Sequence, residues 1–294
     1  MKFGKVDNPE DIVFTLPKDS AANKTLLKDA KKGKANIYIG CAKWNKTDLK
    51  TFYPKGTKDE LGYYATQFNS IELNATFYNN FPVETIEGWY DKTPAEFRFF
   101  PKLYQGISHW KRLKEAKETT DIYLDGIAHL QEKIGMLFLQ MPDNFAPKNW
   151  EVLKAYLEQW PSGFPLALEL RHKGWYDGSF DSELLFEVLE KNNITHIITD
   201  SAGRRDLLHM RLTTPKTFIR YNGANVDSDY TRLDDWFDRL KVWIKDGVED
   251  INFFVHQNHE QASPLLSAYL IQKFNDELGM TLKIPTHPTP LPKR

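Results

Sequence analysis

Cysteine is almost absent from this chain of 294 residues, in which Cys41 is the only one. A single cysteine excludes an internal disulfide and a cysteine-rich zinc site. The first thirty residues contain no apolar run like that of a signal peptide, and no stretch approaches the roughly 20 apolar residues that a membrane-spanning helix needs. We therefore predict a cytoplasmic protein with no membrane partner.

An excess of charge of either sign is also absent. The chain has 39 lysine and arginine residues and 40 aspartate and glutamate residues, which gives a formal net charge of -1. Such a chain has no global attraction to polyanions, so we predict no nucleic-acid partner. The basic run KDAKKGK at 28–34 is typical of a solvated helix end. The sequence is compatible with a monomer.

Glycine-rich nucleotide loops are missing as well. Neither a G-x-G-x-x-G pattern nor a Walker-type loop follows the first apolar run. This argues against an open doubly wound sheet that would hold a phosphate group there. We predict no cofactor.

Short apolar runs recur along the chain from residue 36 onward. Eight of them begin about 31 residues apart on average, which is enough for a strand, a loop, a crossover helix and a second loop in each repeat. The intervening stretches carry apolar residues at helical spacing, at 56–68, 119–133, 149–160, 182–192, 231–247 and 263–276. The eight runs lie at 36–40, 70–74, 97–102, 135–141, 166–171, 195–200, 217–221 and 251–256.

Eight β/α repeats predict a single TIM-type (β/α)8 barrel over residues 36–276, because an eight-stranded parallel sheet can close on itself and leave no exposed edge. The segment between the sixth and seventh runs is too short for a full repeat and makes one unit irregular. Residues 1–35 are polar and lysine-rich, and we predict an N-terminal extension with a short helix at 20–32. Residues 277–294 contain four prolines and should form an extended tail.

Polar residues stand where the predicted strands end. Side chains alternate along a strand, so Leu168 and Leu170 facing the helices would turn Glu169 and Arg171 toward the barrel axis. Barrel enzymes carry their reacting groups at these carboxyl ends. The same counting places further candidates at one cavity: Glu72, Asn74, Lys102, Gln140, Asp200, Arg220, Asn222, His256 and Asn258.

Acid–base chemistry is the leading interpretation of these residues. Glu72 and Glu169 supply two carboxylates for proton transfer, as in glycosidases. Lys102 could polarise a carbonyl group, or form a Schiff base if burial lowers its pKa. Arg171 and Arg220 offer guanidinium groups for an anion. Trp44, Tyr78, His172 and Trp175 would line the pocket of a small polar, anionic or sugar-like ligand.

Three alternatives stay open. The charged residues could pair with one another in a non-catalytic ligand-binding or scaffold protein. A divalent-metal isomerase or hydrolase could instead use the oxygen and nitrogen ligands Glu72, Glu169, Asp200, His172 and His256, although no H-x-H or H-E-x-x-H spacing supports a metal. The loops after the seventh and eighth strands are also the position where many barrels bind phosphate, and here they contain Asn222, Gly223 and His256.

Seven segments in order resemble the YecE-like family of domain of unknown function seventy-two. They are IYIGCAKW at 37–44, FYP at 52–54, FNSIELNATFY at 68–78, FRFFPK at 97–102, FLQMP at 138–142, LELRHKGWY at 168–176 and ITDSAG at 198–203. The resemblance covers about residues 36–276 and implies a TIM-type barrel without an established reaction or cofactor. Its motif positions here are Gly40, Trp44, Glu72, Asn74, Phe77, Tyr78, Lys102, Gln140, Pro142, Glu169, Arg171, His172, Trp175, Asp200 and Arg220.

Two segments depart from that family pattern. Where the family reads R-L-H-G after the seventh strand, this chain has Arg220-Tyr221-Asn222-Gly223. Where the family reads F-N-N after the eighth, it has His256-Gln257-Asn258. The ligand chemistry of this corner therefore differs from the family pattern.

Overall fold

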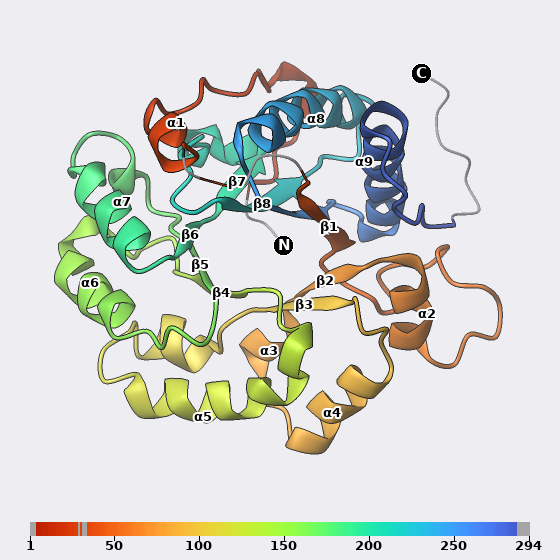
Figure 1. The fold of residues 1–294 in the computed structure, drawn as a ribbon, viewed down its shortest axis with the longest axis horizontal. Coiled ribbons are helices and arrows are strands. Elements are labelled where there is room, and N and C mark those ends of the chain that lie inside the picture. The colour runs from red at the N-terminus through yellow and green to blue at the C-terminus, as the bar shows by residue number, and fades with distance from the viewer. Residues whose placement is uncertain (1–3, 29, 31–33, 287–294) are drawn as a thin grey trace.

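The computed structural model describes residues 4–28, 30 and 34–286 and shows a mixed α/β fold in which every paired strand runs parallel to its neighbours. The strands form three sheets, with orders β1-β9-β8-β7, β2-β3 and β4-β5-β6. In Figure 1 the strands lie toward the middle and the longer helices lie outside them. The parallel α/β class predicted from the repeats is confirmed.

All eight apolar runs contain a strand. The sixth run is divided in two: β6 pairs with β5, and β7 pairs with β8. The strands are β1 (Asn36–Cys41), β2 (Ser70–Leu73), β3 (Arg98–Pro101), β4 (Leu137–Gln140), β5 (Leu166–Glu169), β6 (Thr195–His196), β7 (Ile198–Ser201), β8 (Lys216–Asn222) and β9 (Asp250–His256).

Amphipathic helices fill most of the connections, and each of the six segments with helical spacing overlaps one. Their apolar sides pack on the strands and form the larger of two hydrophobic clusters. The helices are α1 (Ala22–Leu26), α2 (Glu60–Gln67), α3 (Ala75–Tyr78), α4 (Val83–Asp91), α5 (Lys117–Ile127), α6 (Trp150–Glu158), α7 (Ser182–Lys191), α8 (Ser228–Asp246) and α9 (Ser263–Leu278). None of the helices in the described ranges has the length and apolar character needed to cross a membrane.

A second, smaller cluster, which we call the inner cluster, is separate from the helix-facing core. Six of its members are followed two residues later by a polar side chain, because alternate residues of a strand share one face. The inner cluster consists of Phe100, Met136, Phe138, Ala167, Ile197, Phe218 and Phe254. The polar residues that follow are Lys102, Gln140, Glu169, Thr199, Arg220 and His256. The strand pattern thus stacks a polar layer on an apolar one.

Short contacts link the sheets. The isolated parallel bridges Phe99↔Ile134 and Lys102↔Phe138 connect β3 to the chain at β4. Between β1 and β2, the Tyr64 hydroxyl accepts a hydrogen bond from Cys41 N and donates one to Ser70 O. A Cβ atom on Gly40 would collide with the Ser70 carbonyl oxygen. The close approach of β1 to β2 therefore requires glycine at position 40.

The N-terminal segment packs against the second half of the chain. Ser20 N donates to Met210 O, and Asn23 bonds the backbone of Met210 and Leu212. At the other end, residues 279–286 contain no helix or strand, and Asn275 holds Leu282 through two hydrogen bonds. The rest of the tail predicted to be extended, residues 287–294, lies outside the described residues.

Candidate functional site

The candidate site is a layer of polar side chains at the carboxyl ends of the parallel strands, directly beyond the inner cluster. The structure brings together eight of the residues predicted from the sequence, through a continuous set of hydrogen bonds. We call them the polar layer: Glu72, Asn74, Lys102, Gln140, Glu169, Arg171, Arg220 and His256.

Arg220, at the end of β8, joins the two carboxylates of the polar layer. Its Nε and Nη2 atoms donate to Glu72 Oε2 and Oε1 at 2.9 and 2.8 Å, and its Nη1 donates to Glu169 Oε2 at 2.7 Å. The Arg220 side chain is only 1% exposed. A guanidinium group that donates to both carboxylates in this way holds them around one cation.

Glu169 has further donors around it. Arg171 Nε donates to Oε1 at 2.9 Å, Thr199 Oγ1 donates to Oε1 at 3.0 Å, and Gln140 Nε2 donates to Oε2 at 2.5 Å. Burial alone would raise the pKa of Glu169, but the charges of Arg171 and Arg220 lower it below its usual range. Glu169 is therefore ionised at neutral pH.

Glu72, at β2, is held in a similar way. Besides Arg220, it accepts a hydrogen bond from Asn74 Nδ2 at 2.7 Å, and its Oε2 lies 3.1 Å from His256 Nε2. Burial opposes ionisation, yet Arg220 and His256 together keep the pKa of Glu72 well below the ordinary value. Two ionised carboxylates surrounded by donors are poorly suited to donate or accept a proton.

Lys102, just beyond β3, is the exception in the polar layer. Its Nζ donates to Gln140 Oε1 at 2.7 Å and lies 4.1 Å from the centroid of the Phe77 ring. Within the described residues, Lys102 forms no ion pair with a carboxylate. Burial, together with the positive charges of Arg220 and Arg171, lowers the pKa of Lys102 to about 7.

The main chain at Lys102 is held firmly. Its carbonyl oxygen accepts hydrogen bonds from Thr76 Oγ1 at 2.8 Å and from the Tyr123 hydroxyl at 2.9 Å. These contacts fix the start of the side chain, and Phe77 and Gln140 fix its end. The amine is consequently preorganised, although no carboxylate in the described residues forms an ion pair with it.

A cavity of about 610 Å³ lies over the polar layer, between the ends of β1, β2, β3, β8 and β9. Asn74 Oδ1 is buried beside it without a hydrogen-bond partner among the described residues. Six residues predicted from the sequence line the cavity: Asn74, Tyr78, Lys102, Asn222, His256 and Asn258. The sequence analysis missed other lining residues, among them Lys43, Asp48, Lys50, His259 and Glu260, because they lie in loops without a motif.

Four predicted residues lie apart from the polar layer and do not line this cavity. Trp175 is fully buried and donates its indole N–H to Phe145 O at 2.7 Å. Trp44 packs edge-to-face on Trp89. His172 accepts a hydrogen bond from Gly174 N and so caps a short helical turn.

Asp200, the fourth, points toward α8 rather than toward the polar layer. Its Oδ2 accepts a hydrogen bond from Trp236 Nε1 at 2.8 Å, and its Oδ1 forms ion pairs with Arg205 and Arg232. The inward positions of this run are Ile197 and Thr199, which places Asp200 on the opposite face.

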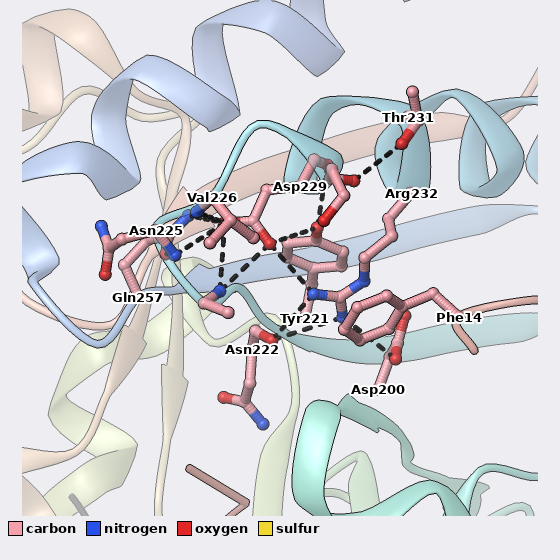
Figure 2. Close-up of polar contacts among 12 residues, drawn as sticks. Phe14, Asp200, Tyr221, Asn222, Asn225, Val226, Asp229, Thr231, Arg232 and Gln257 are labelled. Carbon is pink, nitrogen blue, oxygen red and sulfur yellow. Dashed lines mark hydrogen bonds and ion pairs between the residues drawn. The ribbon is translucent and has the colours of Figure 1, made fainter. Parts of the chain in front are cut away.

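A second group of buried charges, which we call the Asp229 cluster, lies where the loop after β8 leads into α8 (Figure 2). The Asp229 carboxylate, 1% exposed, accepts hydrogen bonds from the backbone N–H groups of Ala224, Asn225 and Val226. Arg232 Nη1 donates to Asp229 Oδ1 at 3.0 Å. Backbone amides gathered in this way form an anion site, and here a carboxylate of the chain itself fills it.

The residues considered as metal ligands are not gathered at one point. Glu72 and His256 are neighbours, whereas Asp200 and His172 have the separate contacts described above. Throughout residues 4–28, 30 and 34–286, no three His, Cys, Asp or Glu side chains are grouped so that they could hold a metal ion.

Comparisons with known proteins agree on one family. The model described as "Protein of unknown function DUF72" matches residues 38–292. UPF0759 protein YecE of Escherichia coli K12 is 27% identical over 274 residues, covering 85% of this chain and 97% of YecE. UPF0759 protein YunF of Bacillus subtilis is 29% identical over 206 residues, covering 64% of this chain and 71% of YunF.

Solved structures give the same family. A DUF72 family protein from Thermotoga maritima superposes with a TM-score of 0.67 at 25% sequence identity, covering 82% of this chain and all of that one (100%). A DUF72 family protein from Enterococcus faecalis superposes with a TM-score of 0.65 at 18% identity, covering 84% and 99%. The second likeness shows the fold alone.

Proposed function

The chain belongs to the DUF72 family, which has no established activity, and from that premise we propose that it binds a small organic anion at the carboxyl ends of its strands and carries out acid–base chemistry on it. One observation carries the proposal: Lys102 is a buried cation without a carboxylate partner in the described part of the chain, and it lines a cavity. Burying such a charge is costly unless a ligand compensates it.

We propose also that the three sheets are sectors of one closed eight-stranded barrel, with β6 and β7 counted as a single strand. The support is that β1 pairs with β9, while the β3–β4 bridges and the Tyr64 hydroxyl link the sheet edges. A barrel would explain why side chains from six strands meet in one layer.

The proton-transfer role belongs to Lys102 in this proposal, with Glu72 and Glu169 as positioning residues. A pKa of about 7 lets the Lys102 amine both take up and release a proton near neutral pH. The two carboxylates instead anchor Arg220 and Arg171, whose charges keep the pKa of Lys102 low. His256 lines the same cavity and is a second group able to carry a proton.

The test is the thermal stability of the wild-type protein and of Lys102→Met with sulfate, phosphate, oxalate and lactate. We expect at least one of these anions to raise the midpoint of wild type by a few degrees, as about 1 kcal/mol of binding would do. Lys102→Met should lose that response. If each of the four anions shifted the midpoints of the two proteins by the same amount, the proposal would be contradicted.

The pH dependence of unfolding gives a second comparison of wild type with Lys102→Met. A lysine whose pKa is lowered on folding makes the native state bind fewer protons than the unfolded state, so stability rises with pH between the two pKa values. For Lys102 this window runs from about 7 to the ordinary value of 10.5. Wild type should therefore gain stability relative to Lys102→Met over this window; parallel curves would contradict the assigned environment.

A further inference from the structure

We infer that Lys102 captures the carbonyl group of a small 2-oxo acid as an imine, an inference that rests on the anion-binding function proposed above. It adds a substrate class, a compound with both a carboxylate and a ketone, and a covalent step at a named atom. The observations that carry it are the position of Lys102 at the cavity, its lack of a carboxylate partner in the described chain and the guanidinium groups around it.

The position of Lys102 suits a nucleophilic amine. The side chain is 5% exposed, yet it lines the 610 Å³ cavity, so the cavity reaches it while most bulk water is excluded. Phe77 and Gln140 hold Nζ from two sides. Such immobilisation reduces the entropy lost when a substrate reacts.

The charge state also suits attack on a carbonyl. Only the neutral amine has the electron pair needed to form a bond to carbon. The pKa of Lys102, lowered to about 7 by burial and by Arg220 and Arg171, leaves about half of the amine neutral at pH 7. That fraction is roughly a thousandfold larger than for an ordinary lysine.

The surroundings favour a carbonyl compound that carries negative charge. Glu72 and Glu169 are already saturated by donors from the protein. At Lys102 the positive charges of Arg220 and Arg171 act more strongly than the negative charges of Glu169 and Glu72, which oppose them. A ligand carboxylate would complement this excess of positive charge, and the unpartnered acceptor Asn74 Oδ1 would take a hydrogen bond from the carbinolamine hydroxyl.

The step balances without an added oxidant or reductant. The Lys102 nitrogen forms a bond to the carbonyl carbon, and the C=O π pair moves to the oxygen, which takes up a proton. The nitrogen then loses a proton to His256 or to water in the cavity. The carbinolamine hydroxyl leaves as water while the C=N bond forms, and His256, which lines the same cavity, is suited to return the proton to the leaving hydroxyl.

Reductive trapping tests the inference directly. Protein is incubated with pyruvate and sodium borohydride at neutral pH, and the adduct is located by peptide mass spectrometry. Acetone is the matched probe without a carboxylate. Wild type should gain the mass of pyruvate less one oxygen at Lys102, at least about tenfold more than at Lys43 or Lys50, the exposed lysines of the same cavity. Acetone should label Lys102 less than pyruvate does.

The imine and anion binding are tested separately. Lys102→Arg keeps the positive charge but cannot form an imine, so it should lose the adduct. The anion response is measured on wild type with lactate, which has no ketone. No pyruvate adduct at Lys102 of wild type, or equal labelling of Lys43 and Lys50, would overturn the inference. If the anion response of wild type persists in that case, the proposed function survives; if it is also missing, both fall.

Discussion

The polar layer and the Asp229 cluster are both built from buried arginine and carboxylate groups at neighbouring strand ends, but they differ in how they are completed. In the Asp229 cluster, Arg232 pairs with Asp200 at 3.1 Å and with Asp229 at 3.0 Å. In the polar layer, Arg220 also bridges two carboxylates, yet Lys102 forms no ion pair within the described chain and borders a cavity. Buried charge alone therefore does not distinguish the two groups. The cavity and the absence of an ion pair at Lys102 in the described chain do.

The polar layer and the Asp229 cluster also differ in what lies over them. The Arg232 guanidinium lies between two aromatic rings, 4.1 Å from the centroid of Phe14 and 4.4 Å from that of Tyr221 (Figure 2). Phe14 belongs to the N-terminal segment, which precedes the residues matched by the family model. The Asp229 cluster is thus closed by the protein itself, whereas the polar layer opens to a space that a small molecule can enter.

The largest effect should come from Arg220→Met, which breaks the polar layer. The substitution leaves Glu72 and Glu169 buried without their shared cation, and we expect it to lower the free energy of unfolding by about 3–5 kcal/mol. Urea denaturation measures the loss. In the variant the buried carboxylates favour protonation, so the deficit should shrink from about pH 7 to about pH 5.

Lys241→Met is the matched control for Arg220→Met. Lys241 is an exposed cation that also pairs with two carboxylates, Asp238 and Glu277, and exposed pairs contribute little. A similar small loss in both variants would show that the buried position of Arg220 adds nothing to its effect on stability. The polar layer would then not depend on its buried ion pairs.

Asp229→Asn should have the next largest effect, because it tests whether the Asp229 cluster is complete in itself. An amide places an NH2 group where one of the two carboxylate oxygens stands. Either the donors at Oδ2, such as Asn225 N, or those at Oδ1, such as Arg232 Nη1, would then face another donor. We expect a loss of about 2–3 kcal/mol in the free energy of unfolding. It stays below that of Arg220→Met since Arg232 keeps Asp200 as a partner.

The control for that variant is Asp238→Asn, at an aspartate whose side chain is 72% exposed. Chemical denaturation should show almost no change there. If the Asp229→Asn protein were as stable as this control, water or the backbone would replace the carboxylate without cost. The backbone amides after β8 would then form an anion site that does not need the carboxylate of Asp229.

Most strands could be predicted from the sequence because each one is a short apolar run with a polar residue at its end. Glu169 and Arg171 flank Leu170, and that alternation alone places both on the inward face. The prediction that Asp200 faces the cavity is wrong. Ile197 and Ile198 are both apolar, so the sequence does not show which of them faces inward. Phe99 and Phe100 illustrate a further ambiguity, since these neighbouring phenylalanines of β3 lie on opposite faces of the strand.

The energetic role of the site residues could not be predicted, because it depends on contacts between distant segments. Glu72 and Arg220 are far apart in the sequence, yet their bidentate pairing decides that Glu72 stays ionised. Trp175 shows the converse: its motif suggests a ligand surface, but Phe145 accepts its indole N–H within the core. Asp229, at the start of α8, carries no sequence signal, because backbone amides and side chains from separate segments meet at it only in the folded chain.

The smallest effect should come from Phe14→Ala, which removes the aromatic cover of the Asp229 cluster. A desolvated cation–π contact with Arg232, together with the longer one of 5.4 Å to Arg205, predicts a loss of about 1–2 kcal/mol in the free energy of unfolding. The neighbouring Val13→Ala, at a side chain that is 76% exposed, should change nothing measurable. Trapping of pyruvate at Lys102 should be the same in both variants, because the cavity borders the polar layer whereas Phe14 covers the Asp229 cluster. If Phe14→Ala instead altered that trapping, the two clusters would be coupled through β8, and the N-terminal segment would act on the ligand site as well as on stability.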